Sequence, residues 1–182
     1  MNEPVSGAML ISDPFLKDPN FMRTVVFLCE YNDDGAFGFV LNRPFEETLD
    51  EFLPELKEPL PVYYGGPVQT DTLHFLHRVP QLIPGGQQVV TGVYWGGDFE
   101  KVVAGITSHS ISPEDIRFYL GYSGWSAGQL EEEIEEKSWL LTMGKEPLVF
   151  HTDPGAIWPA AIKQLDDKYH PIVHYPIDPQ LN

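Results

Sequence analysis

Two apolar segments joined by a turn constrain the fold of this chain most strongly. Residues 24–31 (TVVFLCEY) are rich in β-branched and aromatic side chains, which is typical of a β-strand. Asn32-Asp33-Asp34-Gly35 supplies the residue types of a tight hairpin turn, and residues 36–42 (AFGFVLN) return as a second strand. The sequence therefore predicts an antiparallel β-hairpin at this point.

Further apolar segments predict a sheet with few helices. Strands are expected at residues 8–12, 72–79, 89–95, 116–122, 140–142 and 148–151, and 72–79 should pair with 89–95. Helices are expected at residues 49–53, at 99–106, from 127, and from 154 to about 165 unless the last begins at Pro159. Strands that follow one another in this way favour an α+β fold, with a largely antiparallel, barrel-like sheet flanked by a few helices. We expect a single domain over residues 1–182, with an extended, proline-rich tail from about residue 170.

Two of the expected helices carry capping residues at their starts. Asp98 is a suitable N-cap for the helix at 99–106. Ser126 and Gln129 have the spacing of a capping box, in which each side chain bonds the backbone amide of the other residue, so a helix should begin at Ala127. The glutamate-rich run that follows is expected to be a solvated helix face.

Residues 121–130 (GYSGWSAGQL) suggest two catalytic motifs, and neither fits. A nucleophilic serine on a strand-to-helix turn needs glycine two residues to either side, and Trp125 occupies one of those positions around Ser123. A phosphate-binding loop needs lysine followed by serine or threonine after its last glycine, which the segment lacks. We expect a strand, a glycine turn and a capped helix, with Trp125 either in the core or where another molecule packs close to the backbone.

The charge balance restricts the partners. Asp and Glu number 27 against 11 Lys and Arg, and the net charge of −16 repels phosphate backbones and anionic membranes. No apolar run approaches the roughly 18 residues that cross a bilayer, and the first residues lack the basic and apolar regions of a secretory signal. We therefore expect a cytoplasmic protein that binds neither nucleic acid nor membrane directly.

Two short segments at strand ends suggest a binding site. Leu41-Asn42-Arg43-Pro44 and Tyr64-Gly65-Gly66-Pro67 combine a guanidinium, an amide and open glycine backbone, which together can hold a carboxylate or phosphate. A surface ion pair and an ordinary turn would explain the same residues. Our leading hypothesis is a non-enzymatic binding or regulatory module that holds a small anionic ligand or an acidic segment of a partner. Its expected site residues are Arg23, Asn42, Arg43, Gly65, Gly66 and Trp125.

The alternative hypothesis is an enzyme that uses Cys29 as a nucleophile or redox thiol. Glu30 or a histidine would then be its base, and the thiol would have to be exposed and reactive. A buried, inert thiol is the ordinary expectation for a lone cysteine in an apolar strand. The enzyme therefore remains the second choice, and no cofactor is expected.

Two pairs of histidines raise the question of a metal site. The pairs are His74 with His77 and His170 with His174. These spacings suit one face of a helix, but the first pair lies in an expected strand, where its side chains would point to opposite faces. The second pair flanks a proline in the expected extended tail. We therefore expect no bound metal.

Several short motifs occur in a distinctive order along most of the chain. They are Met9-Leu10-Ile11 with Pro14, Asp18-Pro19-Asn20-Phe21 with Arg23-Thr24-Val25-Val26, Cys29-Glu30, Gly35-Ala36 with Gly38, Leu41-Asn42-Arg43-Pro44, Gly65-Gly66-Pro67-Val68, and Gly121-Tyr122-Ser123-Gly124-Trp125 through Gln129-Leu130-Glu131. In this order they resemble the YqgE/AlgH family of small bacterial cytoplasmic proteins. The resemblance implies an α+β fold with a barrel-like sheet and flanking helices.

The resemblance implies little about function, because the family is essentially uncharacterised. Some members are labelled transcriptional regulators, but the chain shows no basic recognition helix, so only indirect regulation through a protein or small molecule is compatible with its charge. The family typically has alanine in place of Ser123, which again argues against a catalytic serine. Its members commonly carry an arginine in the segment that here reads QTDTL (residues 69–73), so an anion site in this chain lacks that arginine.

Overall fold

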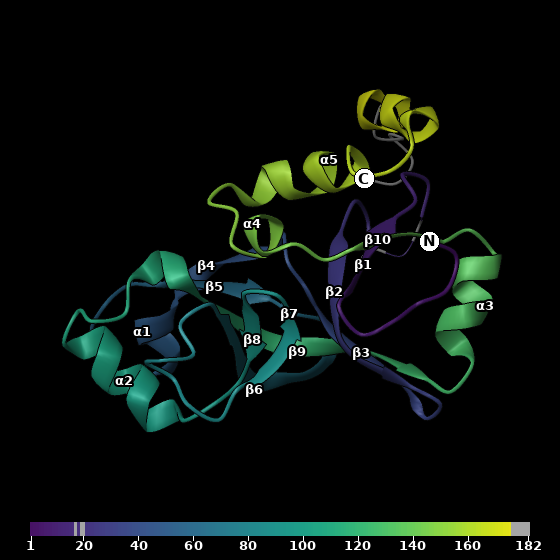
Figure 1. Cartoon of the computed structure of the whole chain (residues 1–182). Helices are drawn as coiled ribbons and strands as arrows, with labels where there is room; N and C mark the ends of the chain where they lie inside the picture. The colour runs from purple at the N-terminus through teal and green to yellow at the C-terminus, as the bar shows by residue number, and fades with distance from the viewer. Residues whose placement is uncertain (17, 19–20, 176–182) are drawn as a thin grey trace.

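The computed structural model describes residues 1–16, 18 and 21–175 of the chain. It contains a ten-stranded sheet in which eight strands follow the order β10-β1-β2-β3-β9-β6-β8-β7, while β5 pairs with β4 and β9 (Figure 1). Every pairing is antiparallel except that of β5 with β9. The predicted α+β class with a largely antiparallel sheet is confirmed. The strands are β1 Ala8–Ser12, β2 Val25–Asn32, β3 Gly35–Val40, β4 Pro44–Thr48, β5 Pro61–Tyr64, β6 Val68–His77, β7 Gln87–Val90, β8 Val93–Trp95, β9 Ile116–Ser126 and β10 Trp139–Met143.

The predicted hairpin is formed by β2 and β3. Asn32 pairs with Gly35 at the turn, and Phe27 pairs with Phe39 deeper in the sheet. A bulge between Leu28 and Glu30 interrupts the register, and bulges of this kind increase the local twist. The hairpin therefore also helps the sheet to curl.

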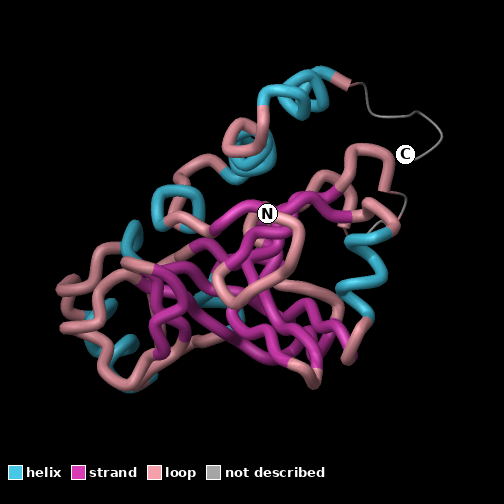
Figure 2. Tube along the Cα trace, turned by 45° about the vertical axis from the view of Figure 1, so that its right-hand side comes forward, coloured by secondary structure: helices cyan, strands magenta, loops and turns pink. Residues whose placement is uncertain are grey.

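The strands form a curled sheet (Figure 2), and residues from its two end strands, β7 and β10, line one hollow. A Cβ atom placed on Gly7, just before β1, would lie 2.6 Å from Cγ1 of Val90 in β7 and 3.4 Å from the side chain of Met143 in β10. The positive φ of Gly7 (89°) and this close approach both require glycine. The expectation of a barrel-like sheet is thus met.

Alternation along the strands divides the core into clusters on different faces. Met9 and Ile11 of β1 face a cluster that includes Trp158 and Ile162 of α5 (Ile157–Ile162). Leu10 faces the opposite cluster, beneath α3 (Gln129–Glu135). A third cluster packs β5, β6 and β9 against α1 (Leu49–Phe52) and α2 (Phe99–Thr107). The α3 and α5 helices therefore cover opposite faces of the β10-β1-β2 part of the sheet.

Most helix predictions are confirmed, with shifted ends. The Asp98 side chain caps α2 by accepting from the amides of Glu100 and Lys101. A 3-10 helix, Pro154–Ala156, leads into α5, so Pro159 lies within a helix that has already begun. The helix expected from residue 127 begins at Gln129, because Gly128 takes the N-cap position with a φ of 81°.

Three strand predictions were wrong in type or in bounds. The segment 148–151 is not a strand: its first residues belong to helix α4 (Glu146–Val149), because a proline at the start favours a helical turn and a short apolar run does not distinguish helix from strand. Residues 89–95 form two strands, since Gly92 (φ 80°) reverses the chain between β7 and β8. The β9 strand continues to Ser126 and not only to residue 122, because Gly124 pairs with Phe37 of β3; the expected glycine turn before α3 lies at Ala127-Gly128.

The tail also differs from its prediction over the residues that the structure describes. Residues Asp167–His174 form a 3-10 helix that contains Pro171, whereas extended chain was expected from about residue 170. Ile172 and Val173 pack against the core cluster beneath α5, and this packing compensates for the proline. Residues 176–182 lie outside the described part of the chain.

Candidate functional site

Asn42 connects the end of β3 to the segment that enters β2. Its Oδ1 accepts a hydrogen bond from the amide of Val25 (3.1 Å), and its Nδ2 donates to the carbonyl of Arg23 (2.9 Å). Both ends of the side-chain amide are thus bonded to backbone. Asn42 thus links the end of β3 to the backbone of residues 23–25, so this motif residue has a structural role.

The two arginines of the expected site also bond backbone oxygens. Arg23 donates to the carbonyl of Tyr175 and lies over the Trp158 ring, with its guanidinium carbon 5.0 Å from the ring centroid. Arg43 donates to the carbonyl of Met22 at 3.2 Å. Burial lowers the pKa of Arg43, although a guanidinium remains charged at neutral pH. An anion bound here would compete with carbonyl groups for these donors.

Close approach of strands explains the two glycines. A Cβ on Gly65 would lie 2.3 Å from the carbonyl oxygen of Gly121, and one on Gly66 would lie 2.1 Å from the carbonyl carbon of Tyr122. Gly66 also has a φ of 154°. The hydroxyl of Ser123 donates to the Gly65 carbonyl at 3.1 Å, so this serine is buried and bonded within the fold. These residues hold β9 in close contact with the loop between β5 and β6.

Trp125 lies in the core, which is one of its two interpretations from the sequence. Its side chain is 6% exposed and packs against the rings of Phe21 and Trp139, with centroids 6.3 and 6.1 Å away. The Glu133 carboxyl lies in the same region, and burial raises its pKa. Trp125 therefore belongs to the cluster beneath α3.

The structure brings together four of the six expected site residues. Arg23, Asn42 and Arg43 meet around the backbone of residues 22–25, and Gly65 adjoins them because the amide just before it donates to the Arg43 carbonyl. Gly66 continues toward β9, and Trp125 lies in a different cluster. The principal cavities of the described chain are lined by other residues, apart from Trp125 at an open hollow beside the β2-β3 turn.

Cys29 has the environment of a structural thiol. Its side chain is buried, and its Sγ lies 4.0 Å from the carbonyl oxygen of Phe27. Burial, and secondarily the charge of Glu30, raise the pKa of the thiol well above its usual value. The exposure and reactivity that the enzyme hypothesis requires are therefore not met.

The histidines of β6 serve packing and backbone bonding. His77 is fully buried, with Nε2 2.9 Å from the Gly96 carbonyl and Nδ1 accepting from the amide of Val79. His74 packs on the other side against the Phe39 ring, at 5.1 Å between centroids. Burial lowers the pKa of both rings. Within the described residues, no group of three or more His, Cys, Asp or Glu side chains is arranged to hold a metal ion.

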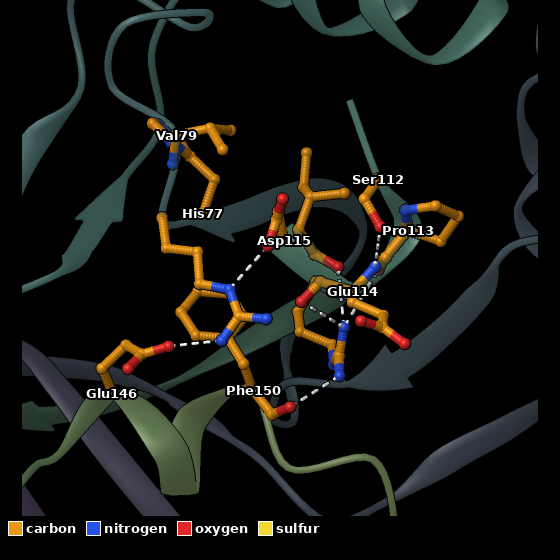
Figure 3. Close-up of polar contacts among 11 residues, drawn as sticks. His77, Val79, Ser112, Pro113, Glu114, Asp115, Glu146 and Phe150 are labelled. Atoms are coloured by element: carbon orange, nitrogen blue, oxygen red, sulfur yellow. Dashed lines mark hydrogen bonds and ion pairs between the residues drawn. The ribbon is translucent and has the colours of Figure 1, made fainter. Parts of the chain in front are cut away.

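The remaining two arginines form a network around Phe150. Arg78 donates to the Asp115 carboxylate at 2.7 Å and pairs with Glu146, so that two carboxylates flank one guanidinium (Figure 3). Arg117 donates to the Phe150 carbonyl at 2.9 Å, and both guanidinium groups lie within 6 Å of the Phe150 ring centroid. All four arginines of the chain are thus engaged inside the fold.

A groove of about 690 Å³ runs along β10, which lies between α3 and the α5 region in Figure 1. All five residues of β10 line it. One wall comes from the end of α3, at Ile134, Glu135 and Lys137. The other wall comes from the end of α5 and the following 3-10 helix, and its residues are Gln164, Leu165, Asp166, Lys168, Tyr169 and Ile172. Met1, Asn2 and Asp13 complete the lining. Its volume lies within the range of ordinary ligand sites.

The sequence-based site did not include this groove. Residues 140–142 were correctly predicted as a strand, but the strand's place at an edge depends on its pairing with β1, more than a hundred residues earlier. The helical walls depend likewise on the packing of α3 and α5. The available signal was weak: an apolar strand between a helix and a proline-rich region.

The fold and the groove define a mixed α+β protein with a curled sheet and a cavity along one sheet edge. The chain belongs to the AlgH-like family, whose model matches residues 9–170. A UPF0301 protein from Chlorobium luteolum is 42% identical over 180 residues, covering 97% of this chain and 94% of the relative. A UPF0301 protein from Cytophaga hutchinsonii is 39% identical, covering 97% and 98%.

Solved structures support the same assignment. The solution structure of the AlgH protein from Pseudomonas aeruginosa has a TM-score of 0.73 and 30% identity, and covers 97% of this chain and 98% of that protein. The crystal structure of a Corynebacterium diphtheriae protein has a TM-score of 0.78 over 94% and 92% of the two chains. At 19% identity, the second likeness shows the fold alone. Within the described residues, no helix is long and apolar enough to cross a membrane.

Proposed function

We propose that this chain is a non-enzymatic binding module that holds a partner protein in the groove along β10. The observation that supports this most directly is the groove itself, a cavity of about 690 Å³ bounded by a sheet edge and two helical walls. Its lining is mixed, with apolar side chains such as Leu165 and Ile172 beside charged ones such as Lys137 and Asp166. A mixed apolar and polar lining suits a protein surface. Regulation by such a module would be indirect, in the cytoplasm, without direct contact to nucleic acid.

A small anionic ligand at Arg23, Asn42, Arg43, Gly65, Gly66 and Trp125 is the second proposal. Its support is the arrangement of the Arg43 guanidinium and the Asn42 amide around the backbone of residues 22–25, from which the Arg23 side chain extends toward Tyr175. It is the weaker proposal, because some donors of these groups already bond backbone oxygens and an anion would compete for them. The lost bonds would offset much of the gain from binding.

One experiment separates the two proposals. Short random peptides are selected on the purified protein by display, and the selected peptides are mapped by their effect on backbone amide NMR signals. We expect the largest changes at Leu140–Met143 and at Leu165 and Tyr169, which line the groove. Changes confined to Arg23, Asn42 and Arg43 would contradict the groove and favour the anion site.

A further inference from the structure

We infer that the occupant of the groove is an extended, positively charged segment of a partner protein, which joins the sheet as an additional strand beside β10. This inference rests on the proposed function and specifies the conformation and charge of the partner. Three features of the structure carry it: the hydrogen-bond pattern of β10, the arrangement of the two walls, and the charge of the chain.

The hydrogen-bond pattern leaves alternate peptide groups of β10 facing the groove. Gly144 donates to the carbonyl of Gly7, and Asp13 donates to the carbonyl of Ser138, which marks these as directly bonded pairs at the two ends of the β1-β10 ladder. In an antiparallel ladder such pairs recur at every second residue. Leu140 and Thr142 therefore bond β1.

The residues between them point the other way. The peptide groups of Trp139, Leu141 and Met143 face away from β1, and β10 ends the strand order among the described residues. No hydrogen bond from these outward groups is found in the described chain. A row of unused donors and acceptors at strand spacing is a template for another strand. The five residues of β10 span about 17 Å, which is an ordinary strand length.

The two walls match the side chains of an added strand. Successive side chains of a strand point to opposite faces of the sheet. Beside β10, one set would face Ile134 and Lys137 at the end of α3, and the other would face Leu165, Tyr169 and Ile172. Trp139 and Leu141 already pack toward α3, whereas Leu140 packs toward α5, so the floor of the groove follows the same alternation. A partner segment that bound as a helix would leave the outward peptide groups of β10 unpaired, because its own backbone groups bond within the helix.

The charge of the chain favours a basic occupant. The net charge is −16, and the groove itself is lined by Asp13, Glu135 and Asp166 against Lys137 and Lys168. A strongly acidic protein attracts cationic partners and raises their association rate. The acidic partner considered from the sequence depended on the arginines, which are engaged elsewhere in the fold.

Proline at Met143 tests the strand pairing, with alanine as its matched control. Met143 is 38% exposed, and its amide faces the groove, so proline removes one outward donor without taking a bond from the β1 ladder. The Met143→Ala variant removes the same side chain and keeps the donor. The probe is a capped short peptide that alternates lysine and valine, titrated into the full chain while the amide signals are recorded.

We expect the lysine-valine peptide to shift the signals of Trp139, Leu141 and Met143. Its affinity should fall about tenfold or more in Met143→Pro and stay within about threefold in Met143→Ala. Equal affinities for the two variants, with binding still in the groove, would overturn strand addition and leave the binding module intact. If a glutamate-valine peptide binds as tightly, the basic character is wrong. If neither peptide shifts the groove signals, this inference fails, and the peptide selection described above decides the proposed function separately.

A second measurement covers the case in which the proline variant does not fold. The lysine-valine peptide is methylated on the backbone nitrogens of either its lysines or its valines, and both derivatives are titrated into the unmodified protein. Only one set of amides can face β10 in an added strand, so one derivative should lose binding and the other should keep it. Equal binding of both derivatives, or equal loss, would overturn strand addition.

Discussion

The junction around Asn42 and the edge of β10 differ in whether their backbone polar groups are hydrogen-bonded. At the junction, side chains of motif residues bond main-chain groups: Asn42 joins Val25 to Arg23, and Arg43 holds Met22. At β10, no motif residue is present, and peptide groups of Leu141 and Met143 face a groove with no partner among the described residues. The comparison teaches that distinctive polar residues can serve architecture, while an ordinary apolar strand can leave peptide groups open at a sheet edge, where we propose that a partner binds.

The largest expected effect comes from adding a methyl group at Gly66, where the loop between β5 and β6 meets β9. In Gly66→Ala, the new Cβ would lie about 2.1 Å from backbone carbon of Tyr122, at a φ of 154° that alanine rarely adopts. We expect the free energy of unfolding to fall by about 3 kcal/mol or more, measured by urea denaturation. The control is Gly128→Ala, which has a positive φ but open space, and should cost about 1 kcal/mol. Equal losses would show that packing at Gly66 is unimportant.

Removing the amide of Asn42 should have the next largest effect. Asn42→Ala deletes two hydrogen bonds to backbone, one that Oδ1 accepts from the Val25 amide and one that Nδ2 donates to the Arg23 carbonyl. It should lower the free energy of unfolding by about 2 kcal/mol. Gln87→Ala, at an exposed position of β7, should change it by less than about 0.5 kcal/mol. If Asn42→Ala is as stable as the parent protein, the junction does not depend on these bonds and a binding role for Asn42 gains support.

Arg43→Ala sharpens the distinction between architecture and anion binding. The variant loses the bond to the Met22 carbonyl, so we expect about 1 kcal/mol less stability and unchanged affinity of groove-binding peptides. Both quantities are measured on the same preparation, by denaturation and by peptide titration. Unchanged stability, together with lost affinity for an anion such as phosphate, would contradict the architectural role and favour the second proposal.

The smallest expected effect concerns the pH dependence of stability near the β10 edge. Burial raises the pKa of Glu133, so its ionised form costs stability in the folded state, and that cost appears as pH rises through the raised pKa. Glu133→Gln should therefore raise the neutral-pH free energy of unfolding by less than about 1 kcal/mol. The difference should vanish below the ordinary glutamate pKa. Glu132→Gln, an exposed neighbour, should change nothing, and an equal gain there would assign the effect to net charge alone.

Local signals made part of the fold predictable. The β2-β3 hairpin, β1 and the Asp98 cap follow from short stretches of sequence whose turn and capping residues act within a few positions. The α4 helix was missed because Leu148 and Val149 lie in a run too short to show a period. The extension of β9 was missed because pairing with β3 overrides the glycines at its end.

The candidate site was less predictable than the fold, for a related reason. Residue types at Arg23, Asn42 and Arg43 indicated hydrogen-bonding groups, and the sequence could not show that backbone oxygens would occupy them. One edge of β10 is open because no other described strand pairs with it. Such a property depends on the whole sheet order, so no local pattern at residues 139–143 encodes it.

Amide hydrogen exchange of β10, measured residue by residue in the unmodified protein, tests the central claim most directly. If one side of the strand is open, the amides of Leu140 and Thr142, which bond β1, should be protected. The amides of Trp139, Leu141 and Met143 should exchange at least about tenfold faster, and a bound lysine-valine peptide should slow them. Equal protection of all five amides in the free protein would show that the edge is already paired, and would contradict the account.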